Sequence, residues 1–291
     1  GAAGFRLDVA DELPDSFIEK VRTAVKRVSP DKFLLGEVWE DATTKFGFDK
    51  RRTYLLGKGL DSVMNYPFKN AVLPFKNAVL GFVCGRDAGQ TMTDILTLCE
   101  HYPAPALDTA LNFLSTHDTE RALTVIADEP ANGRGRAWQS GRCVTGDAYE
   151  EGMLRLRMAY AIIYTLPGVP CLYYGDEIGM QGYRDPFNRA FFCWDSHEER
   201  LRPVLAQLAQ LRHSCEAFRT GALRVLRAEG GILHYQRIGE AETAEIIVNR
   251  TEHIIVEPLA SGKHTEVNPM GFTIVVEEIG HNPDHSYYDY Q

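Results

Sequence analysis

The sequence has few features of a metal centre or a disulfide framework. None of its six cysteines belongs to a C-x-x-C pair, although zinc sites and disulfide frameworks usually leave clustered or regular spacings. Cys171 lies in the apolar run GVPCLYYG, where a free thiol behaves as a small hydrophobic side chain. We therefore expect free thiols, no metal ligands and a reducing compartment, which favours a cytoplasmic protein.

Long apolar runs and an excess of positive charge are also missing. The run AYAIIYTLPGVPCLYYG is interrupted by two prolines and falls short of the roughly 20 residues that cross a bilayer. The chain carries 40 acidic and 31 basic residues, a net charge of -9, which disfavours nucleic acid and anionic membranes as partners. There is no G-x-S-x-G, P-loop or H-E-x-x-H motif, so the enzyme classes that use these motifs have no support.

The first two thirds of the chain alternate short apolar segments with amphipathic ones. Apolar residues recur at helical spacing in the segment DSFIEKVRTAVKRVS. Near-continuous apolar strands separated by helices are typical of a parallel sheet covered by helices. The pattern therefore predicts an α/β fold with strands at 5–9, 33–39, 59–66, 110–118 and 171–177, and further helices at 152–166 and 200–214.

After about Ala217 the segments become β-branched and are separated by glycine, asparagine and charged turns. The expected strands here are LRVLRAE, ILHYQRI, AEIIVNR, HIIVEPL and FTIVVEE. This pattern predicts a small antiparallel β-sandwich, so that residues 1–217 and 218–291 form two domains. The tail HNPDHSYYDYQ is expected to be loosely ordered. The repeated PFKNAVL at 67–73 and 74–80 spans nearly two helical turns per copy, and its first copy is expected to be an added loop.

Acidic side chains follow several of the expected strands. Asp8 closes the first strand and Glu37 the second, while His117-Asp118 ends the fourth and 176–177 the fifth. In a barrel of parallel strands these ends form one rim, where such enzymes place catalysis. Taken singly, each residue has an ordinary explanation as a helix cap, a solvated loop residue or a turn residue. Three carboxylates that meet at one rim repel one another at a cost in stability, so together they indicate an active site.

These stretches resemble motifs of the α-amylase superfamily, glycoside hydrolase family 13. GFRLDVADE is similar to the family motif at the end of barrel strand four, LLGEVWE to that on strand five, and FLSTHDTER to that on strand seven. GVPCLYYGDEIGMQGYRDPFNRAFFCW resembles strand eight with the loop that follows it. The resemblance runs from Gly4 to about Trp194 and begins at the fourth strand. It implies a partial TIM (β/α)8 barrel, strands 4–8, in an N-terminally truncated chain.

The resemblance also implies roles for individual residues. Asp8 corresponds to the nucleophile, Glu37 to the general acid/base and Asp118 to the group that stabilises the transition state. Arg6 is expected to keep Asp8 ionised, and His117 to bind sugar hydroxyls. Retaining glycosidases need one carboxylate that attacks the anomeric carbon and one carboxyl group that protonates the leaving oxygen.

Further positions that the resemblance assigns to substrate binding are Asp11, Glu12, Trp39, Asp185 and Arg189. Trp39 is expected to stack on a sugar face. Asp185 and Arg189 match family positions that contact a sugar on the donor side, with a loop salt bridge as the alternative. Asp11 and Glu12 stand where secreted α-amylases carry a basic residue and then histidine. Glu12 resembles the cyclomaltodextrinase and neopullulanase branch, and this departure disfavours a calcium site.

The function implied is a retaining glycoside hydrolase that cleaves α-1,4 links, with α-1,6 links as a second option, in maltodextrins, starch-type or cyclic glucans. An α-glucan oligosaccharide or polysaccharide is then the partner, and no cofactor, nucleic acid or membrane is expected. A transglycosylase or isomerase of the family stays an alternative because it uses the same acids. The second alternative is an inactive fragment or a non-catalytic binding relative. The presence of all three acids argues against a binding relative. Because a barrel depends on closure, we expect the chain by itself to lack hydrolase activity.

Overall fold

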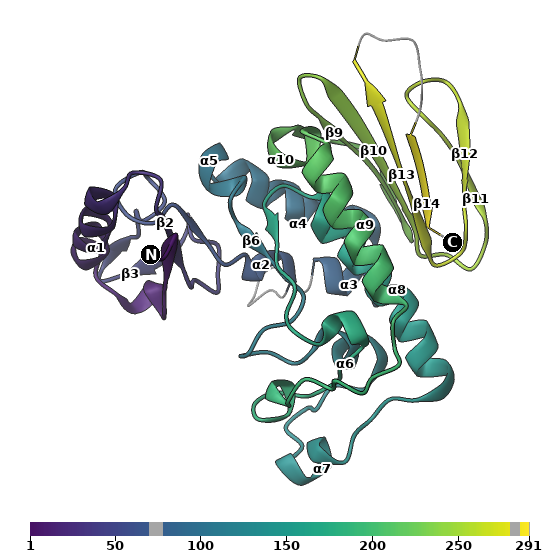
Figure 1. The fold of residues 1–291 in the computed structure, drawn as a ribbon, viewed down its shortest axis with the longest axis horizontal. Helices are drawn as coiled ribbons and strands as arrows, with labels where there is room; N and C mark the ends of the chain where they lie inside the picture. The colour runs from purple at the N-terminus through teal and green to yellow at the C-terminus, as the bar shows by residue number, and fades with distance from the viewer. Residues whose placement is uncertain (70–77, 280–285, 291) are drawn as a thin grey trace.

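The computed structural model describes residues 1–69, 78–279 and 286–290, and its first two thirds contain a series of short parallel strands (Figure 1). β2 lies between β1 and β5, β6 pairs with β7, and a parallel bridge from Met64 to Leu111 joins the two groups. The strands therefore follow one another in chain order, as expected for this α/β pattern. They are β1 (Gly4–Leu7), β2 (Phe33–Gly36), β5 (Ser62–Val63), β6 (Leu111–Asn112) and β7 (Val169–Pro170).

The parallel sheet is open and shorter than the sequence predicts. Within the described residues β1 has β2 as its sheet neighbour and β7 has β6, so no closed barrel forms. The strand expected at 171–177 is wrong, because β7 ends at Pro170 and the chain turns at Gly175, where φ is 85°, into the short helix η2 (Asp176–Ile178). Beyond the end of β7, Tyr173 and Tyr174 pack against the Arg121 guanidinium.

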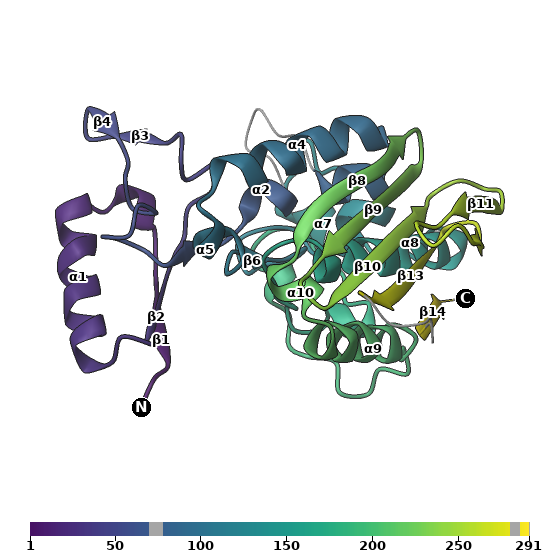
Figure 2. The same cartoon turned by 90° about the horizontal axis from the view of Figure 1, so that it is seen from above.

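Helices pack beside β5, β6 and β7, and α8 (Gly146–Thr165) lies at the centre of the packing. It is almost wholly buried from Met158 to Thr165 and contacts α3, α6 and α9. With β1 and β2, α1 projects at one end of the molecule, as Figures 1 and 2 both show. The other helical segments are η1 (Ala10–Glu12), α1 (Asp15–Val28), α2 (Tyr66–Lys69), α3 (Val79–Val83), α4 (Ala88–His101), α5 (Ala104–Leu107), α6 (Ala122–Ala127), α7 (Arg136–Ser140), η3 (Phe187–Arg189), α9 (Leu201–Ser214) and α10 (Ala217–Thr220), and a two-stranded ribbon comprises β3 (Phe46–Gly47) and β4 (Lys50–Arg51).

The C-terminal part is an antiparallel sheet, as the sequence predicts, with the strand order β14-β13-β10-β9-β8. One face packs on the helices through Tyr235, Ile246 and Ile274, which belong to the same apolar core as α8. The β11–β12 hairpin covers part of the other face in a small cluster around Ile247 and Val267. The second layer of the expected sandwich is therefore only two strands wide in the described residues. The strands are β8 (Ala222–Glu229), β9 (Ile232–Ile238), β10 (Glu242–Asn249), β11 (Ile255–Pro258), β12 (His264–Val267), β13 (Gly271–Glu278) and β14 (Ser286–Tyr290).

Two smaller expectations concern the tail and the repeat. The tail is not loosely ordered at 286–290, because β14 pairs antiparallel with β13 from Phe272 to Val276. The repeat at 67–80 lies mostly outside the described residues, and its described ends belong to α2 and α3. The domain boundary after Ala217 stays a prediction, since one apolar core extends across it.

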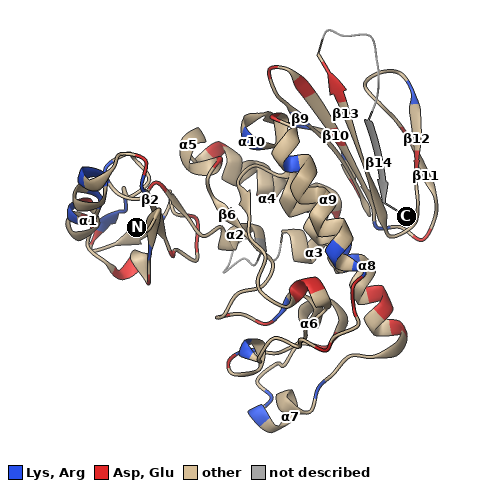
Figure 3. Cartoon of the chain, viewed as in Figure 1, with Lys and Arg blue, Asp and Glu red and all other residues tan. Residues whose placement is uncertain are grey.

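Acidic and basic residues are interspersed along the chain (Figure 3). Basic side chains gather on α1, whereas acidic ones mark the first turns of α8. None of the helices in the described ranges combines the length and the hydropathy needed to span a bilayer.

Candidate active site

The register of β1 and β2 sets two acidic residues side by side. Leu7 is paired with Gly36, so Asp8 and Glu37 each come one residue after the paired strand ends. The backbone N–H of Glu37 donates to the Leu7 carbonyl at 3.0 Å, and the Ala10 N–H donates to the Glu37 carbonyl at 3.1 Å. Parallel strands put their carboxyl ends at the same edge, which explains why residues 29 positions apart meet here.

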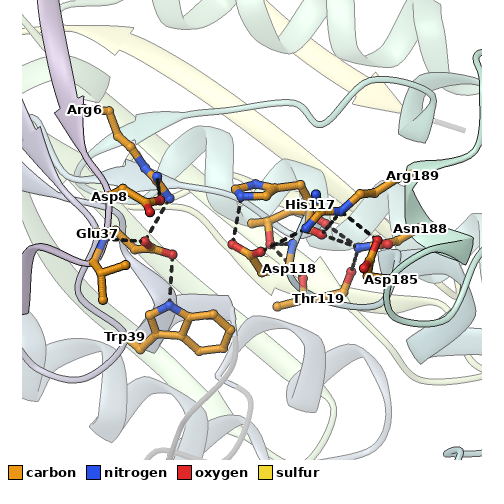
Figure 4. Close-up of polar contacts among 12 residues, drawn as sticks. Arg6, Asp8, Glu37, Trp39, His117, Asp118, Thr119, Asp185, Asn188 and Arg189 are labelled. Atoms are coloured by element: carbon orange, nitrogen blue, oxygen red, sulfur yellow. Dashed lines mark hydrogen bonds and ion pairs between the residues drawn. The ribbon is translucent and has the colours of Figure 1, made fainter.

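The Arg6 guanidinium connects the two carboxylates. Its Nη1 atom donates to Asp8, and its Nη2 atom lies 3.1 Å from Glu37 Oε2 (Figure 4). The Asp8 side chain is 75% exposed and the Glu37 side chain 6% exposed. A planar guanidinium presents several donors in a fixed geometry, so one side chain orients both acids.

Glu37 has further polar partners. Its Oε2 accepts from the Val9 N–H at 2.9 Å, and its Oε1 accepts from Trp39 Nε1 at 3.1 Å. Val9 has a φ of 45°, a strained conformation for a β-branched residue that costs on the order of 1–3 kcal/mol. The strain occurs where the chain turns after Asp8 and aims an N–H at Glu37.

Asp118 faces this pair from the segment after β6. His117 Nε2 lies 3.0 Å from Asp118 Oδ2, and Arg189 Nη2 lies 3.4 Å from Asp118 Oδ1. The Asp118 N–H donates to Thr116 Oγ1 at 3.1 Å. In Figure 4 the Asp118 group stands across from Asp8 and Glu37.

One open cavity of about 530 Å³ brings the candidate residues together. Eight residues line it: Asp8, Val9, Asp11, Glu12, Glu37, Trp39, His117 and Asp118. Seven of these are residues that the sequence predicts for the site, and Val9 is the addition. Arg6 contacts two of the lining acids, so the predicted residues from β1, β2 and the β6 loop form one group.

Asp185 and Arg189 do not line this cavity. Arg189 Nε lies 3.1 Å from Asp185 Oδ1, which is the loop salt bridge that the sequence leaves as the alternative. Arg189 Nε also donates to the His117 carbonyl at 2.9 Å. Both side chains are about half exposed, and Arg189 is directed toward the Asp118 segment.

Trp39 has one ring face covered. It stacks on Tyr66 with the ring centroids 4.4 Å apart and the planes 12° from parallel, and Phe113 meets Tyr66 edge-on. Burial raises the pKa of Tyr66 well above its usual 10, so its hydroxyl stays neutral. One face of the Trp39 ring is thus covered by Tyr66, and its N–H donates to Glu37.

Asp11 has a basic partner that the sequence did not single out. Lys45 Nζ lies 3.2 Å from Asp11 Oδ2 and 2.7 Å from Glu40 Oε2. Burial lowers the pKa of Lys45, but the hydrogen bonds that its ammonium donates to Glu40 and Asp11 outweigh this effect and raise the pKa above 10.5. Lys45 lies 34 residues from Asp11, and no local pattern predicts such a pair. Glu12 is exposed at the cavity.

The acidic residues 176–177 at the end of the fifth expected strand are not part of the cavity lining. Asp176 is 2% exposed; its Oδ1 pairs with Arg121 Nη1 at 3.2 Å, and its Oδ2 accepts from the Tyr160 hydroxyl at 2.7 Å. Asp176 is therefore a structural residue. Within the described ranges, no group of three or more His, Cys, Asp or Glu side chains is arranged to hold a metal ion.

Residues 1–221 match the model of the alpha amylase catalytic domain. This match covers most of the chain, which therefore belongs to the α-amylase family, glycoside hydrolase family 13. The family resemblance seen in the sequence motifs is confirmed. Cyclomaltodextrinases and a neopullulanase are among the chain's relatives.

Individual relatives align over most of this chain but over a minority of their own length. The amylopullulanase of Thermoanaerobacter thermohydrosulfuricus is 33% identical over 247 residues, which cover 81% of this chain and 15% of that protein. The cyclomaltodextrinase of Geobacillus thermopakistaniensis is 32% identical over 262 residues, which cover 88% of this chain and 38% of that protein. The chain thus spans less than half the length of these curated relatives.

Solved structures resemble this fold. The ligand-free cyclic alpha-maltosyl-(1-->6)-maltose hydrolase from Arthrobacter globiformis superimposes with a TM-score of 0.78 at 26% identity. The superposition covers 96% of this chain and 56% of that one. The same hydrolase has also been solved in complex with its cyclic substrate and with maltose.

Proposed function

We propose that the protein is a retaining glycoside hydrolase that cleaves α-glucosidic bonds of maltodextrins, starch-type or cyclic glucans. The observation that carries the proposal is the Arg6 guanidinium, which contacts Asp8 and Glu37 at the same time. Retaining glycosidases hold their two carboxyl groups roughly 5–5.5 Å apart, and a guanidinium shared by Asp8 and Glu37 brings these two acids near one another. The family membership and the bound sugars of the Arthrobacter globiformis hydrolase support an α-glucan as the substrate.

In the proposed first step, an Asp8 oxygen forms a bond to the anomeric carbon as the glycosidic carbon–oxygen bond breaks. Glu37 transfers its proton to the leaving oxygen, which departs as the hydroxyl of the second sugar. In the second step a water attacks the anomeric carbon from the opposite side and gives its proton to Glu37, and Asp8 is released. Two inversions at one carbon give net retention.

The environment of each acid suits its proposed role. Asp8 is the most exposed of the three acids, so the sugar reaches it without displacing protein. Asp118 stands across the cavity and offers a negative charge to the oxocarbenium-like transition state. His117 is 42% exposed beside Asp118 and is placed to hydrogen-bond a sugar hydroxyl.

Azide rescue distinguishes the two carboxyl roles, and we predict opposite products for the two variants. With α-maltosyl fluoride, whose leaving group needs no proton, Glu37→Ala still forms the glycosyl-enzyme, and azide then gives α-maltosyl azide. Asp8→Ala lacks the nucleophile, so azide attacks the anomeric carbon of the α-fluoride directly, displaces fluoride ion with inversion and gives β-maltosyl azide. The products are identified by NMR in the protein that carries this chain. The opposite pair of anomers would overturn the assignment.

Unrescued turnover on maltotriose and β-cyclodextrin is the companion measurement. We expect Asp8→Asn and Glu37→Gln to lose about 10³-fold or more in kcat without a matching loss of thermal stability. Glu151→Gln, on an exposed pair with Arg155 in α8, is the control and keeps the wild-type rate. Products longer than the substrate would instead identify a transglycosylase.

A further inference from the structure

Asn188 is a fully buried side chain beside the candidate site that the sequence motifs did not single out. It lies in η3 and is 0% exposed. Its Nδ2 atom donates to the carbonyls of Thr116 at 3.2 Å, His117 at 2.8 Å and Thr119 at 2.8 Å. These carbonyls precede and follow Asp118, and Figure 4 shows the amide directed at this segment.

The segment around Asp118 has no helix or strand of its own. β6 ends at Asn112, and residues 116–119 form a turn. Backbone carbonyls inside a protein need hydrogen-bond donors, and a regular element normally supplies them from the chain itself. At this turn a side chain that is 69 to 72 residues away supplies them instead.

The chemistry of the amide fixes its orientation. An amide carries two N–H donors on nitrogen and only acceptors on oxygen, and three carbonyl oxygens surround this nitrogen, so two hydrogens serve three acceptors. The reversed amide would place an oxygen against three oxygens. Asn188 Oδ1 is buried with no hydrogen-bond partner in the described residues, which leaves donation as the function of this side chain.

We infer that Asn188 is a positioning residue that fixes Asp118 for the reaction, an inference that rests on the proposed function. The neighbouring Arg189 complements it, since its Nε donates to the His117 carbonyl and its Nη2 pairs with Asp118 Oδ1. Asn188 thus holds the backbone of the turn while Arg189 holds the carboxylate. Loss of the amide lets the turn move, and a misplacement of about 1 Å costs about 100-fold in rate.

Asn249 offers a matched control. It is also 0% exposed, and its Nδ2 donates to three carbonyls, those of His253, Val267 and Asn268, in the C-terminal sheet. Asn188→Ala and Asn249→Ala each remove three hydrogen bonds that a buried Nδ2 donates to carbonyls, and Asn249→Ala also removes two that Oδ1 accepts from Thr251. If Asn188 only stabilises the fold, Asn188→Ala lowers kcat no more than Asn249→Ala does.

The experiment compares these variants in the protein that carries this chain, with α-maltosyl fluoride as substrate. We expect Asn188→Ala to lower kcat about 10- to 100-fold with KM within about twofold, whereas Asn249→Ala lowers the melting temperature and leaves kcat unchanged. In an Asp118→Asn background, Asn188→Ala is expected to cause little further loss of kcat, because both changes act through one carboxylate. Equal kcat values for Asn188→Ala and Asn249→Ala would overturn the inference. So would a loss of kcat on Asn188→Ala that is as large in the Asp118→Asn background as in the wild type.

A second variant tests the inference if Asn188→Ala does not fold, and an NMR measurement tests it without turnover. Asn188→Ser keeps one hydroxyl donor and adds no charge, so it is the milder change that replaces the alanine variant if that one fails to fold. NMR of the His117 ring reports the geometry of the His117–Asp118 pair without any turnover. Its resonances are expected to shift in the Asn188 variant and not in Asn249→Ala. If the wild-type protein is inactive but the His117 resonances shift in the Asn188 variant, the proposed function is wrong and the positioning role of Asn188 stands. If the His117 resonances do not shift, the positioning role of Asn188 is wrong.

Discussion

At the scale of single residues, the candidate site depends on which side chain orients which. Arg6 contacts Asp8 and Glu37, and Arg189 contacts Asp118 and Asp185. The carboxylates are thus held by guanidinium groups from both sides of the cavity. Because a guanidinium is planar and always charged, it holds two acids at a fixed spacing that a flexible ammonium does not reproduce.

We predict that Arg6→Lys lowers kcat about 100-fold, because a lysine ammonium is a single point charge and does not bridge Asp8 and Glu37. The melting temperature is expected to change little, since lysine keeps a positive charge beside the buried Glu37 and the pair with the exposed Asp8 contributes only about 0–1 kcal/mol to stability. Steady-state kinetics and a thermal melt on the same preparation test this. Retention of more than half of the wild-type kcat would show that the bridge is dispensable.

At the scale of elements, Asp61 ties α1 to the strands that carry Asp8 and Glu37. It accepts from Arg22 and Lys26 of α1 at 2.7 and 2.8 Å, and from the Leu34 N–H of β2 at 2.8 Å. Burial alone raises the pKa of Asp61, but these hydrogen bonds outweigh it and bring the pKa below 3.8. The ionised form is therefore favoured in the folded state.

We predict that Asp61→Asn destabilises the fold by about 1–3 kcal/mol at pH 7. The folded pKa is lower than the unfolded one, so the stabilisation is fully present above the unfolded pKa of about 4 and is lost as the pH falls through the folded pKa. Urea unfolding of wild type and variant from pH 7 to pH 3 measures the difference. A difference as large at pH 3 as at pH 7 contradicts this account.

At the scale of the whole molecule, β1 is the exposed edge of the parallel sheet. In the described residues its sheet neighbour is β2, and Phe5 in its middle is 55% exposed. An unpaired edge with an apolar side chain is a template for association with another chain. The candidate cavity lies at the carboxyl end of this same edge, where Asp8 and Val9 follow β1.

We predict that the 291-residue chain, expressed by itself, associates in a concentration-dependent way and hydrolyses maltotriose poorly. Phe5→Lys is expected to reduce the association, because a charge on an edge strand opposes pairing. Phe17→Lys, which replaces a similarly exposed phenylalanine on α1, is the control for general loss of apolar surface. Size exclusion with light scattering measures both. A monodisperse, active wild-type monomer would show that this edge is harmless.

The sequence alone determined the short-range features of this protein. The alternation of apolar strands with helices, the antiparallel C-terminal segments and the acids Asp8, Glu37 and Asp118 after strands are local patterns. Each depends on residues a few positions apart, where periodicity and motif are informative. The expected strand at 171–177 is wrong, since the chain turns at Gly175 and Tyr173 and Tyr174 pack on the guanidinium of Arg121, some 50 residues away, which no local pattern encodes.

Only the tertiary structure determined which distant side chains contact one another. It joined Lys45 to Asp11, stacked Trp39 on Tyr66 and directed Asn188 to the turn at Asp118. These contacts join segments 27 to 71 residues apart. They form when strands and helices pack against one another, whereas local sequence determines only the secondary structure of each segment. The buried Asn188 amide nitrogen finds its acceptors where the folded chain provides them, and no spacing within the sequence encodes those partners.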